Sequence, residues 1–536
     1  MTHDQAEQTI GQALDLAVAR FGDKEAFTYA DRRLSFRDVD RESDAVARAL
    51  LGFGIKRGDY VAVWMANHSP WAALYFGILK IGAILVPLNT RSRPDELVFG
   101  LENSNATMFI FKREKKGRTD YGELLLETIP ELKDARPGDL HARALPHLRT
   151  VVDVADAPMT GALSFGDFLA RGKDISEADL AAAKRAVRPR DEAVIVYTSG
   201  TTSVPKGAQL YHEGMLHSVR WSDSCIALTE RDVYFSLQPV YHSGGAIGAM
   251  LRPVVDGCRL VTQPYFDPGD ALAAIEGEGV TVMSGLQPHW VEYLNHPSLP
   301  QRKLKVERAF VMAPPELLWT IYEKMGIEGL VTGYCMTETH LYGTNTTLAD
   351  SQEVRYNTNG RPNPNVEVEI RDPDDGTLLG IEEPGEIFMR VPHPMSGYLG
   401  EPQLTADVLG ADGWYRTGDN GVIRPDGNLI LLGRVRDLIR VGGENLSGAE
   451  VEAVLVAHPA VKQAAAVPAP DARLGEIVVA FVEVKPGMSV TEAELTEHCR
   501  AKLANFKVPR AIHFVTQWPM TGSGKVQKRS LLETVA

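Results

Sequence analysis

A run of hydroxyl-bearing and small residues closed by a lysine lies between two apolar segments of the chain. It reads Thr198-Ser199-Gly200-Thr201-Thr202-Ser203-Val204-Pro205-Lys206-Gly207. Glycine lets a backbone approach a ligand closely, and hydroxyls with exposed N–H groups form an anion site to which a lysine adds charge. The run is not a Walker A loop, because Pro205-Lys206-Gly207 stands where glycine-lysine-serine or -threonine is required. It predicts a polyphosphate site, with a surface turn as the alternative.

Further segments carry residue types suited to nucleotide and metal chemistry. In residues 332–338, Tyr334 could stack on a base, and Thr337 and Glu338 offer the hard oxygen ligands that magnesium prefers. Asp419 could accept hydrogen bonds from ribose hydroxyls, and Lys525 stands in a glycine-rich segment that could carry one charge to a phosphate. Taken singly, each has a plain alternative: a helix start, a turn aspartate or a solvated basic tail.

The elements around these segments follow from local patterns. Residues 60–64 and 193–197 are apolar runs typical of buried strands, and Ser35 with Asp38 predicts the start of an amphipathic helix. Asp426-Gly427 between apolar runs predicts a hairpin in a small β-subdomain. Residues 447–450 and 491–494 are capping-box helix starts on either side of a strand at 477–482. The sequence therefore predicts a layered α/β body followed by a compact α+β unit.

Composition limits the class of protein. The chain has 536 residues, 44% of them hydrophobic and 24% charged, and a formal net charge of −14. That charge argues against wholesale binding of nucleic acid or of an anionic membrane. Four scattered cysteines without a paired spacing argue against a disulfide framework or a zinc site and favour a reducing cytoplasm. No signal peptide is predicted, and the apolar stretch 71–88 is expected to be a buried helix running into a strand.

In this order, the motifs resemble those of the ANL superfamily of adenylate-forming enzymes, and the resemblance covers nearly the whole chain. It implies a large multi-subdomain N-terminal domain, residues 1–435, with layered α/β structure and a small β-barrel-like subdomain. A smaller mobile α+β domain, residues 436–536, is implied to rotate about a hinge between two half-reactions. The first would join a carboxylate to ATP as acyl-AMP with release of pyrophosphate, and the second would transfer the acyl group to a thiol.

The resemblance also implies roles for individual residues. Thr198, Ser199, Gly200, Thr201, Thr202 and Lys206 match the phosphate loop; Tyr334 matches the adenine-stacking position; Thr337 matches an α-phosphate contact; Glu338 matches the magnesium-associated glutamate; Asp419 and Arg434 match ribose contacts; and Arg436 matches the hinge. Lys525 matches the adenylation lysine, Gly442, Gly443 and Glu444 match the wall of the pantetheine tunnel, and His242 matches the aromatic position beside the acyl carboxylate, with an ordinary loop histidine as the alternative.

Three positions depart from the superfamily pattern. Ser203, Met312 and Cys335 stand where glycine is usual. Ser203 could deny the phosphate loop a positive-φ conformation, which would weaken the ATP-dependent half-reaction. Met312 and Cys335 could reshape the acyl pocket. Compensation by neighbouring residues is the alternative for all three.

The expected function is that of an acyl-CoA ligase using ATP, Mg²⁺ and coenzyme A on an apolar carboxylic acid. No carrier-protein segment is found in the sequence, which favours a free thiol acceptor. The first alternative is a ligase with a lost or weakened adenylation half, which makes acyl-CoA from preformed acyl-AMP. The second is a non-catalytic adenylate-binding protein. A membrane span and a nucleic-acid partner are not expected, and self-association as a homo-oligomer is left open.

Overall fold

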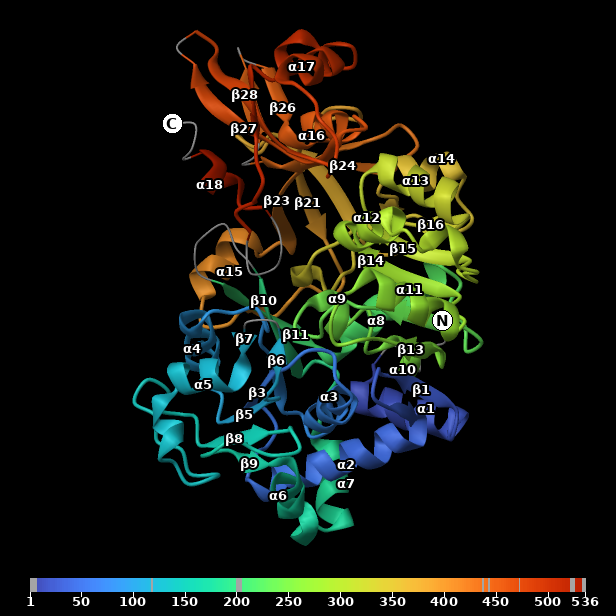
Figure 1. Cartoon of the computed structure of the whole chain (residues 1–536). Helices are drawn as coiled ribbons and strands as arrows, with labels where there is room; N and C mark the ends of the chain where they lie inside the picture. Colours follow the sequence, from blue (N-terminus) through green and yellow to red (C-terminus); the bar gives the residue numbers. More distant parts are fainter. Residues whose placement is uncertain are drawn as a thin grey trace.

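The computed structural model describes residues 7–116, 119–198, 205–435, 438–441, 444–471, 473–520 and 526–532. Figure 1 shows two large sheets with their helices in the lower and right parts of the view, and the C-terminal residues at the top. Among the described helices, none is long and apolar enough to cross a membrane. The stretch 71–88 forms α3 (Pro70–Lys80) followed by β4 (Ile84–Pro87), as predicted.

The first large sheet carries both strands that flank the predicted phosphate segment. Its strand order is β22-β11-β10-β4-β3-β5-β8-β9. The bounds are β22 (Gly397–Tyr398), β11 (Lys206–Tyr211), β10 (Glu192–Thr198), β4, β3 (Tyr60–Trp64), β5 (Met108–Phe111), β8 (Thr150–Asp153) and β9 (Leu163–Ser164). β10 pairs in parallel with β4 and antiparallel with β11. The predicted strands at 60–64 and 193–197 are confirmed, and their burial matches that of strands covered on both faces.

The second large sheet has the order β16-β15-β14-β12-β13-β1-β2. The bounds are β16 (Gly329–Val331), β15 (Arg308–Met312), β14 (Val282–Leu286), β12 (Val233–Ser236), β13 (Arg259–Val261), β1 (Glu25–Thr28) and β2 (Arg33–Ser35). Except at the β1–β2 pair, the neighbouring strands run parallel. Parallel strands need helical crossovers, which explains the layers of helices on both faces.

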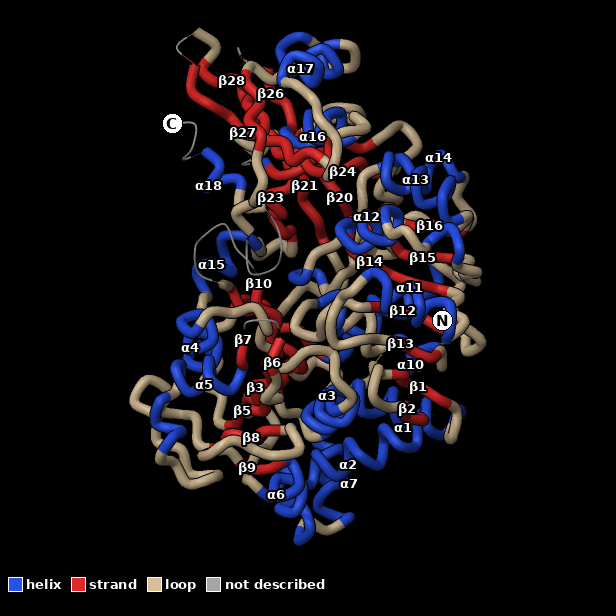
Figure 2. The backbone as a smooth tube through the Cα atoms, viewed as in Figure 1, coloured by secondary structure: helices blue, strands red, loops and turns tan. Residues whose placement is uncertain are grey.

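Helices fill the space between the sheets and cover their outer faces (Figure 2). The inner layer consists of α1 (Ile10–Phe21), α2 (Phe36–Gly52), α3 and α8 (His212–Cys225). The outer helices are α4 (Pro94–Asn103) and α5 (Tyr121–Thr128) on the first sheet, and α11 (Pro268–Gly277), α12 (Gln287–Asn295) and α13 (Pro315–Met325) on the second. The predicted capping pair Ser35 and Asp38 starts α2. This layering confirms the α/β prediction.

A buried lysine joins two helices of the inner layer. The side chain of Lys80, the last residue of α3, is fully buried, and its Nζ lies 2.6 Å from Oδ1 of both Asp40 and Asp44 on α2. A buried ammonium is tolerated only when it is paired in this way. The charge that interrupts the apolar stretch 71–88 therefore fixes α3 against α2.

The small β-subdomain predicted after residue 360 is an open sheet in the part of the chain that the structure describes. Its order is β20-β21-β23-β24, with β20 (Glu367–Arg371), β21 (Gly385–Arg390), β23 (Trp414–Ile423) and β24 (Leu429–Arg434). Gly427 has a φ of +82° in the turn between β23 and β24, which confirms the hairpin. Beside it lies a sheet of β17 (Gly333–Tyr334), β18 (Thr344–Asn345) and β19 (Arg361–Pro362). No closed barrel forms among these described strands, so the barrel-like shape is not observed.

The C-terminal residues form their own α+β layer. The sheet order is β26-β25-β28-β27, with β29 on β28; the bounds are β26 (Glu444–Ser447), β25 (Leu438–Val441), β28 (Gly475–Val484), β27 (Val461–Asp471) and β29 (Ala511–Phe514). Helices α16 (Gly448–Val456) and α17 (Glu492–Arg500) begin at the predicted caps Ser447 and Thr491. The predicted capping box forms at Thr491 with Glu494 but not at Ser447, where Glu450 pairs with Lys507 instead. The buried apolar side chains here, from Ile439 to Leu531, pack with one another in clusters separate from those of the two large sheets.

The remaining elements lie mostly at the surface. They are β6 (Lys115–Lys116), β7 (Thr119–Asp120), α6 (Phe165–Ala170), α7 (Glu177–Ala186), α14 (Gln352–Asn357), α15 (Pro402–Val408), α18 (Lys528–Leu532) and the 3-10 turns η2 (Pro130–Lys133), η3 (Arg171–Asp174), η4 (Leu299–Gln301) and η7 (Asn505–Lys507).

Candidate active site

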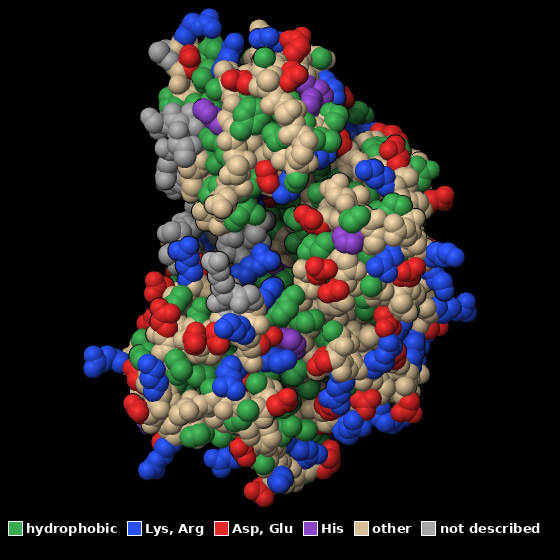
Figure 3. Space-filling view, in the orientation of Figure 1, with side chains coloured by type: hydrophobic (Ala, Val, Ile, Leu, Met, Phe, Trp, Pro, Cys, Tyr) green, Lys and Arg blue, Asp and Glu red, His purple; other side chains and the backbone are tan. Residues whose placement is uncertain are grey.

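A cavity of about 830 Å³ lies where the ends of β10, β11, β23 and β24 meet the turn after β17. Figure 3 shows the surface hollowed between the C-terminal part at the top and the larger body below, with lysine and arginine side chains at the edge of the hollow. The wall includes the predicted site residues Thr198, Lys206, His242, Thr337, Glu338 and Arg434. Segments that are distant in the sequence therefore meet at one cavity.

The two described ends of the predicted phosphate segment lie side by side. Thr198 is the register partner of Lys206, and its Oγ1 donates to the Lys206 carbonyl over 3.4 Å. The Nζ of Lys206 lies 5.4 Å from the ring centroid of Tyr398. Five predicted or departing positions lie outside the described residues: Ser199, Gly200, Thr201, Thr202 and Ser203.

A hydrogen-bonded network of hydroxyls orients the predicted magnesium-associated glutamate. Thr337 and Glu338 lie in the 3-10 turn η5 (Thr337–Thr339). The Tyr398 hydroxyl donates to Glu338 Oε1 over 2.8 Å and lies 3.1 Å from the Tyr415 hydroxyl. Burial, together with the Glu338 charge, raises the pKa of both phenols above the ordinary value, so both stay protonated and can donate.

The predicted ribose contacts form a charged pair between a buried aspartate and an arginine that is partly exposed at the cavity. Asp419 and Arg434 are register partners on β23 and β24, and Arg434 Nε lies 2.8 Å from Asp419 Oδ1. The Tyr334 hydroxyl donates to Asp419 Oδ2 over 2.6 Å. Tyr334 is only 4% exposed, and the wall of the cavity beside it is formed by Thr417, Gly418 and Arg434. Tyr334 and Asp419 thus lie next to the wall and fix the position of Arg434.

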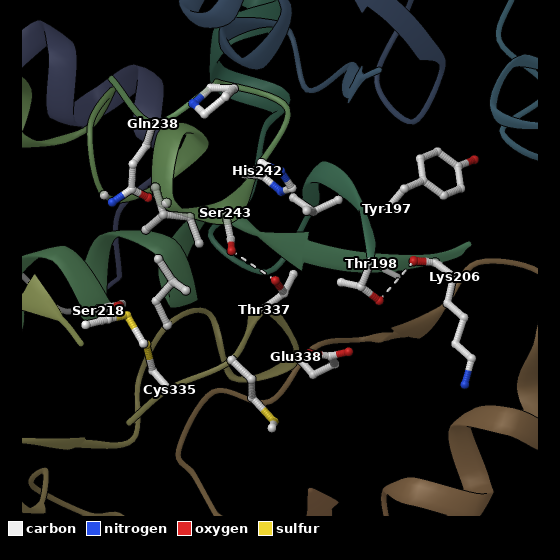
Figure 4. A pocket seen from close by; sticks show the side chains of 18 of the residues that line it. Tyr197, Thr198, Lys206, Ser218, Gln238, His242, Ser243, Cys335, Thr337 and Glu338 are labelled. Carbon is white, nitrogen blue, oxygen red and sulfur yellow. Dashed lines mark hydrogen bonds between the residues drawn. The ribbon is translucent and has the colours of Figure 1, made fainter. Parts of the chain in front are cut away.

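His242 stands at the middle of the cavity, as the N-cap of the one-turn helix α9 (Ser243–Ala246). In Figure 4, His242, Ser243 and Thr337 separate two ends of the cavity: Thr198, Lys206 and Glu338 lie on one side, and Ser218, Gln238 and Cys335 on the other. The Ser243 and Thr337 hydroxyls lie 2.9 Å apart, which joins α9 to η5. The glycines of α9 let it pack against the preceding segment, since a Cβ at Gly244 would lie 1.4 Å from Gln238 Oε1 and one at Gly245 would lie 2.0 Å from the Pro239 carbonyl oxygen.

Two of the three departures from the superfamily pattern lie on the cavity wall. Met312, the last residue of β15, is 39% exposed, and Cys335 follows Tyr334 directly. Burial raises the pKa of the Cys335 thiol to about 12, so the thiol stays neutral. Both positions are compatible with a role in shaping the acyl pocket, which stays a prediction.

Several site residues were predicted on segments that lie outside the described residues. Arg436, Gly442, Gly443 and Lys525 are among them, and the side chain of Glu444, the first residue of β26, is not described either. Their roles stay predictions.

Sequence reasoning missed other residues that line the cavity. Ser243 adjoins His242, and Tyr415 stands in the same segment as Asp419. Arg252 could have been found from the sequence, because it is the one charged residue in the apolar segment 246–255. An arginine is seldom buried without a partner or a ligand. Tyr398 carries no signal in the sequence, since only the pairing of β22 with β11 brings it to Glu338.

Comparisons with known proteins agree with this geometry. The family model described as AMP-binding enzyme matches residues 14–399, and that described as AMP-binding enzyme C-terminal domain matches residues 450–525. The putative acyl-CoA synthetase YngI of Bacillus subtilis is 34% identical, over 98% of this chain and 96% of its own length. The mitochondrial medium-chain acyl-CoA ligase ACSF2 of Mus musculus is also 34% identical, over 98% of this chain and 87% of its own length.

Solved structures of related enzymes share the fold of this chain over nearly its whole length. The anthranilate CoA ligase AuaEII in complex with anthranoyl-AMP has a TM-score of 0.87 at 26% identity, over 99% of this chain and 98% of its own. The amide bond synthetase McbA from Marinactinospora thermotolerans has a TM-score of 0.81 at 28% identity, over 99% of this chain and all of its own. The chain belongs to the AMP-binding enzyme family, within the ANL superfamily. Within that family it is an acid–thiol ligase of the AMP-forming acyl-CoA synthetase class.

Proposed function

We propose that this enzyme converts a carboxylic acid with an apolar body, ATP and coenzyme A to acyl-CoA, AMP and pyrophosphate through an acyl-AMP intermediate. One observation carries the proposal: a single cavity joins the ends of β10 and β11, the Glu338 turn and Arg434 on one side of His242 to a second chamber on the other side. A nucleotide and an acid placed in the two chambers would meet beside His242 and Thr337.

The chemistry consists of two displacements. In the first, a carboxylate oxygen attacks the α-phosphorus and pyrophosphate leaves. In the second, the sulfur of coenzyme A attacks the acyl carbon, its proton is lost, and AMP leaves. Alignment in a cavity and neutralisation of phosphate charge are what the protein must supply. Thr198, Ser199, Gly200, Thr201, Thr202 and Lys206 would bind the phosphates and Thr337 the α-phosphate. Asp419 and Arg434 would bind the ribose and Tyr334 the adenine side.

Glu338 is proposed to hold Mg²⁺. Its carboxylate lies on the cavity wall, and Tyr398 satisfies only one lone pair of Oε1. No cluster of three or more acidic, histidine or cysteine side chains suited to a metal occurs in the described part of the chain. A single carboxylate fits Mg²⁺, which keeps water and phosphate oxygens as its other ligands. When bound, the ion would neutralise phosphate charge.

We further propose that residues 1–435 and 436–536 act as two domains that rotate about Arg436 between the half-reactions. The separate apolar clusters on either side of this boundary support the division. In one arrangement Lys525 would reach the cavity for adenylation, and in the other Gly442, Gly443 and Glu444 would line the path of the pantetheine arm. A cytoplasmic location is proposed from the cysteine pattern alone.

The test measures the two half-reactions separately. A panel of acids is offered with ATP and Mg²⁺ to measure exchange of labelled pyrophosphate, and each acid is also offered as its acyl-adenylate with coenzyme A to measure thioester. Exchange and thioester together support the full reaction. Thioester from acyl-AMP without exchange supports a ligase with a weakened adenylation half, as Ser203 could cause. Tight binding of an acyl-adenylate mimic with neither product would support a non-catalytic protein and contradict the proposal.

A further inference from the structure

The chamber beyond His242 ends in polar side chains. We call this end the far wall; it comprises five of the residues that line the cavity: Ser218, Ser222, Tyr234, Arg252 and Ser284. Apolar residues, among them Val219, Ile247 and Phe310, line the same chamber. A pocket for a plain hydrocarbon chain would gain nothing from hydroxyls and a guanidinium at this end, because desolvating them without a hydrogen bond costs free energy.

The strand register places three hydroxyls of the second sheet together. Tyr234 and Ser236 alternate on the same face of β12, and Ser236 is the register partner of Ser284 on β14. The Tyr234 and Ser284 hydroxyls are hydrogen-bonded, and Ser284 Oγ donates to Ser236 Oγ over 3.2 Å. The next partner in the row, Phe310 on β15, is apolar. The sheet thus presents hydroxyls at one side of the chamber and an aromatic ring at the other.

Arg252, a residue of the far wall, has a buried guanidinium nitrogen without a hydrogen-bond partner among the described residues. It is the first residue of α10 (Arg252–Asp256), is 4% exposed, and its guanidinium carbon lies 4.6 Å from the ring centroid of Tyr234. Its Nη2 donates to Ser222 Oγ over 3.2 Å, and its Nε lies 3.0 Å from Asp223 Oδ1. Its Nη1 is buried and has no hydrogen-bond partner among the described residues. An orphaned buried donor of this kind costs about 1–3 kcal/mol, which a ligand oxygen would recover.

The charges around Arg252 decide between a neutral acceptor and an anion. Asp223 is 1% exposed and pairs with Arg252, so the guanidinium charge is already matched. Burial and the adjacent Asp223 carboxylate raise the pKa of Asp256 well above its usual range, so Asp256 is neutral and adds no second negative charge. Arg220, whose charge also acts on Asp256, donates to Gln8 Oε1 over 2.7 Å. A second carboxylate in this chamber would be desolvated opposite an arginine that already has a counter-ion.

We propose that the acid bound by this enzyme carries a neutral oxygen acceptor, a hydroxyl or a carbonyl, at the end remote from its carboxylate, and that Arg252 Nη1 donates to that oxygen at the far wall. Ser218 faces the same space and supplies a second polar contact. The proposal rests on the proposed function only in placing the carboxylate beside His242. It refines the expected apolar acid to one with an apolar middle and an oxygenated end.

The experiment uses matched acyl-sulfamoyl-adenosine analogues, so that binding is measured without turnover. The three ligands share one chain length and end in a methyl, a hydroxymethyl or a carboxylate group, and Kd is measured by calorimetry. We expect the hydroxymethyl analogue to bind roughly 10-fold more tightly than the methyl analogue, which corresponds to recovering about 1.4 kcal/mol at the orphaned donor. In R252K the ratio should fall toward about 1, because the main donor to that oxygen is removed, and in S218A it should fall by about 2- to 5-fold, because a second contact is lost.

A matched control separates this role from a loss of packing. Arg308 is also paired with an aspartate, Asp232, but is not among the residues that line the cavity. R308K should therefore keep the wild-type ratio, even if its thermal stability falls as much as that of R252K. S218A changes no charged group, so it keeps the test open if R252K fails to fold.

Equal or tighter binding of the methyl analogue to the wild type would overturn the inference, as would an unchanged ratio in both variants. Tightest binding of the carboxylate analogue would overturn the choice of a neutral acceptor. Failure of the proposed function is distinguishable: no pyrophosphate exchange and no thioester with any acid, while the hydroxymethyl preference persists, would remove the reaction and leave the far wall as assigned. Turnover of plain fatty acids with a Kd ratio of about 1 would support the proposed function and overturn the assignment of the far wall.

Discussion

Glu338 shows how a single side chain depends on residues that no local pattern connects. Its carboxylate accepts from Tyr398, which in turn lies beside Tyr415, so two strands of different sheets orient one oxygen. The second carboxylate oxygen takes no part in this network of described residues, so it and the remaining lone pair of Oε1 can serve the proposed Mg²⁺. The phenols stay protonated because burial raises their pKa, so the orientation is maintained at neutral pH.

The first prediction separates the charge of Glu338 from its orientation. E338Q should lower the rate of acyl-AMP formation by roughly 10²–10³-fold, the usual effect of removing one electrostatic contribution to a transition state. Y398F leaves the carboxylate in place and should cost less than about 10-fold, the value of one neutral hydrogen bond. Pyrophosphate exchange measures both. Equal losses in the two variants would show that Glu338 acts through its hydrogen bond and not its charge.

His340 is a second residue whose surroundings fix its protonation state. Its Nε2 accepts from the Tyr211 backbone N–H over 3.1 Å, and its Nδ1 lies 3.0 Å from the His393 carbonyl. Burial lowers the pKa of His340 to about 3, and an added proton on Nε2 would point at an N–H group. The folded protein therefore requires neutral His340.

The second prediction is a loss of stability in acid. The folded pKa of His340 is below its unfolded value of about 6.5, so the unfolded chain binds the proton first. The contribution of His340 to the free energy of unfolding should thus be constant above about pH 7 and fall as the pH drops from about 6.5 toward 3. In H340N, where asparagine tolerates the φ of +55°, urea midpoints at pH 7 and pH 5 should differ less than in the wild type. H141Q, at an exposed histidine, should keep the wild-type difference.

At the scale of elements, α10 positions Arg252 although it is only a short helix. It ends at Gly257, whose φ is +74°, and a Cβ there would lie 2.1 Å from Cζ of the Phe21 ring. The backbone conformation and the space both require glycine. Since α10 touches α1 through this ring, the position of the far wall depends on a helix near the N-terminus.

The third prediction tests that packing. G257A should lower stability by about 1–2 kcal/mol for the left-handed conformation and by a further 1–3 kcal/mol for the clash with Phe21. G54A is the matched control, because Gly54 has a φ of +79° but a Cβ added there would meet no described atom within 4 Å. G54A should therefore lose only about 1–2 kcal/mol, the cost of the left-handed conformation. Thermal midpoints of both variants measure the difference, and equal midpoints would contradict a role for the Phe21 contact.

The elements also show what a sequence can predict and what it cannot. The caps at Ser35, Ser447 and Thr491 and the Asp426-Gly427 hairpin were predictable, because each depends on residues within four positions of one another. The far wall was not, because it depends on the parallel register of β12 and β14, which lie 48 residues apart at Ser236 and Ser284. Family motifs could be matched for the proposed nucleotide side for the same reason: their residues are local runs. The distal acyl pocket has no local pattern of this kind.

At the scale of the molecule, the proposed reaction needs two arrangements of one chain. The apolar clusters of residues 439–531 are separate from those of the two large sheets, so the C-terminal part could rotate as a unit without exposing either core. The net charge of −14 would oppose a polyanion, so the proposed binding of ATP depends on local cations such as Lys206 and Arg434 on the cavity wall.

The fourth prediction concerns this alternation. K525A should abolish most of the acyl-AMP formation while thioester formation from supplied acyl-AMP stays within about 3-fold of the wild type, because the lysine would be needed in one arrangement only. Pyrophosphate exchange and thioester release, assayed on the same preparation, measure the two halves. Comparable losses in both assays would show that the lysine is misassigned.

Because Lys80 is enclosed, its reactivity can report local opening between α2 and α3 during turnover. Mixed anhydrides acylate free amines, and a reagent cannot touch an ammonium that is sealed between α2 and α3 by Asp40 and Asp44. Acylation at Lys80, read by mass spectrometry against that at surface lysines, would therefore count how often those two helices part.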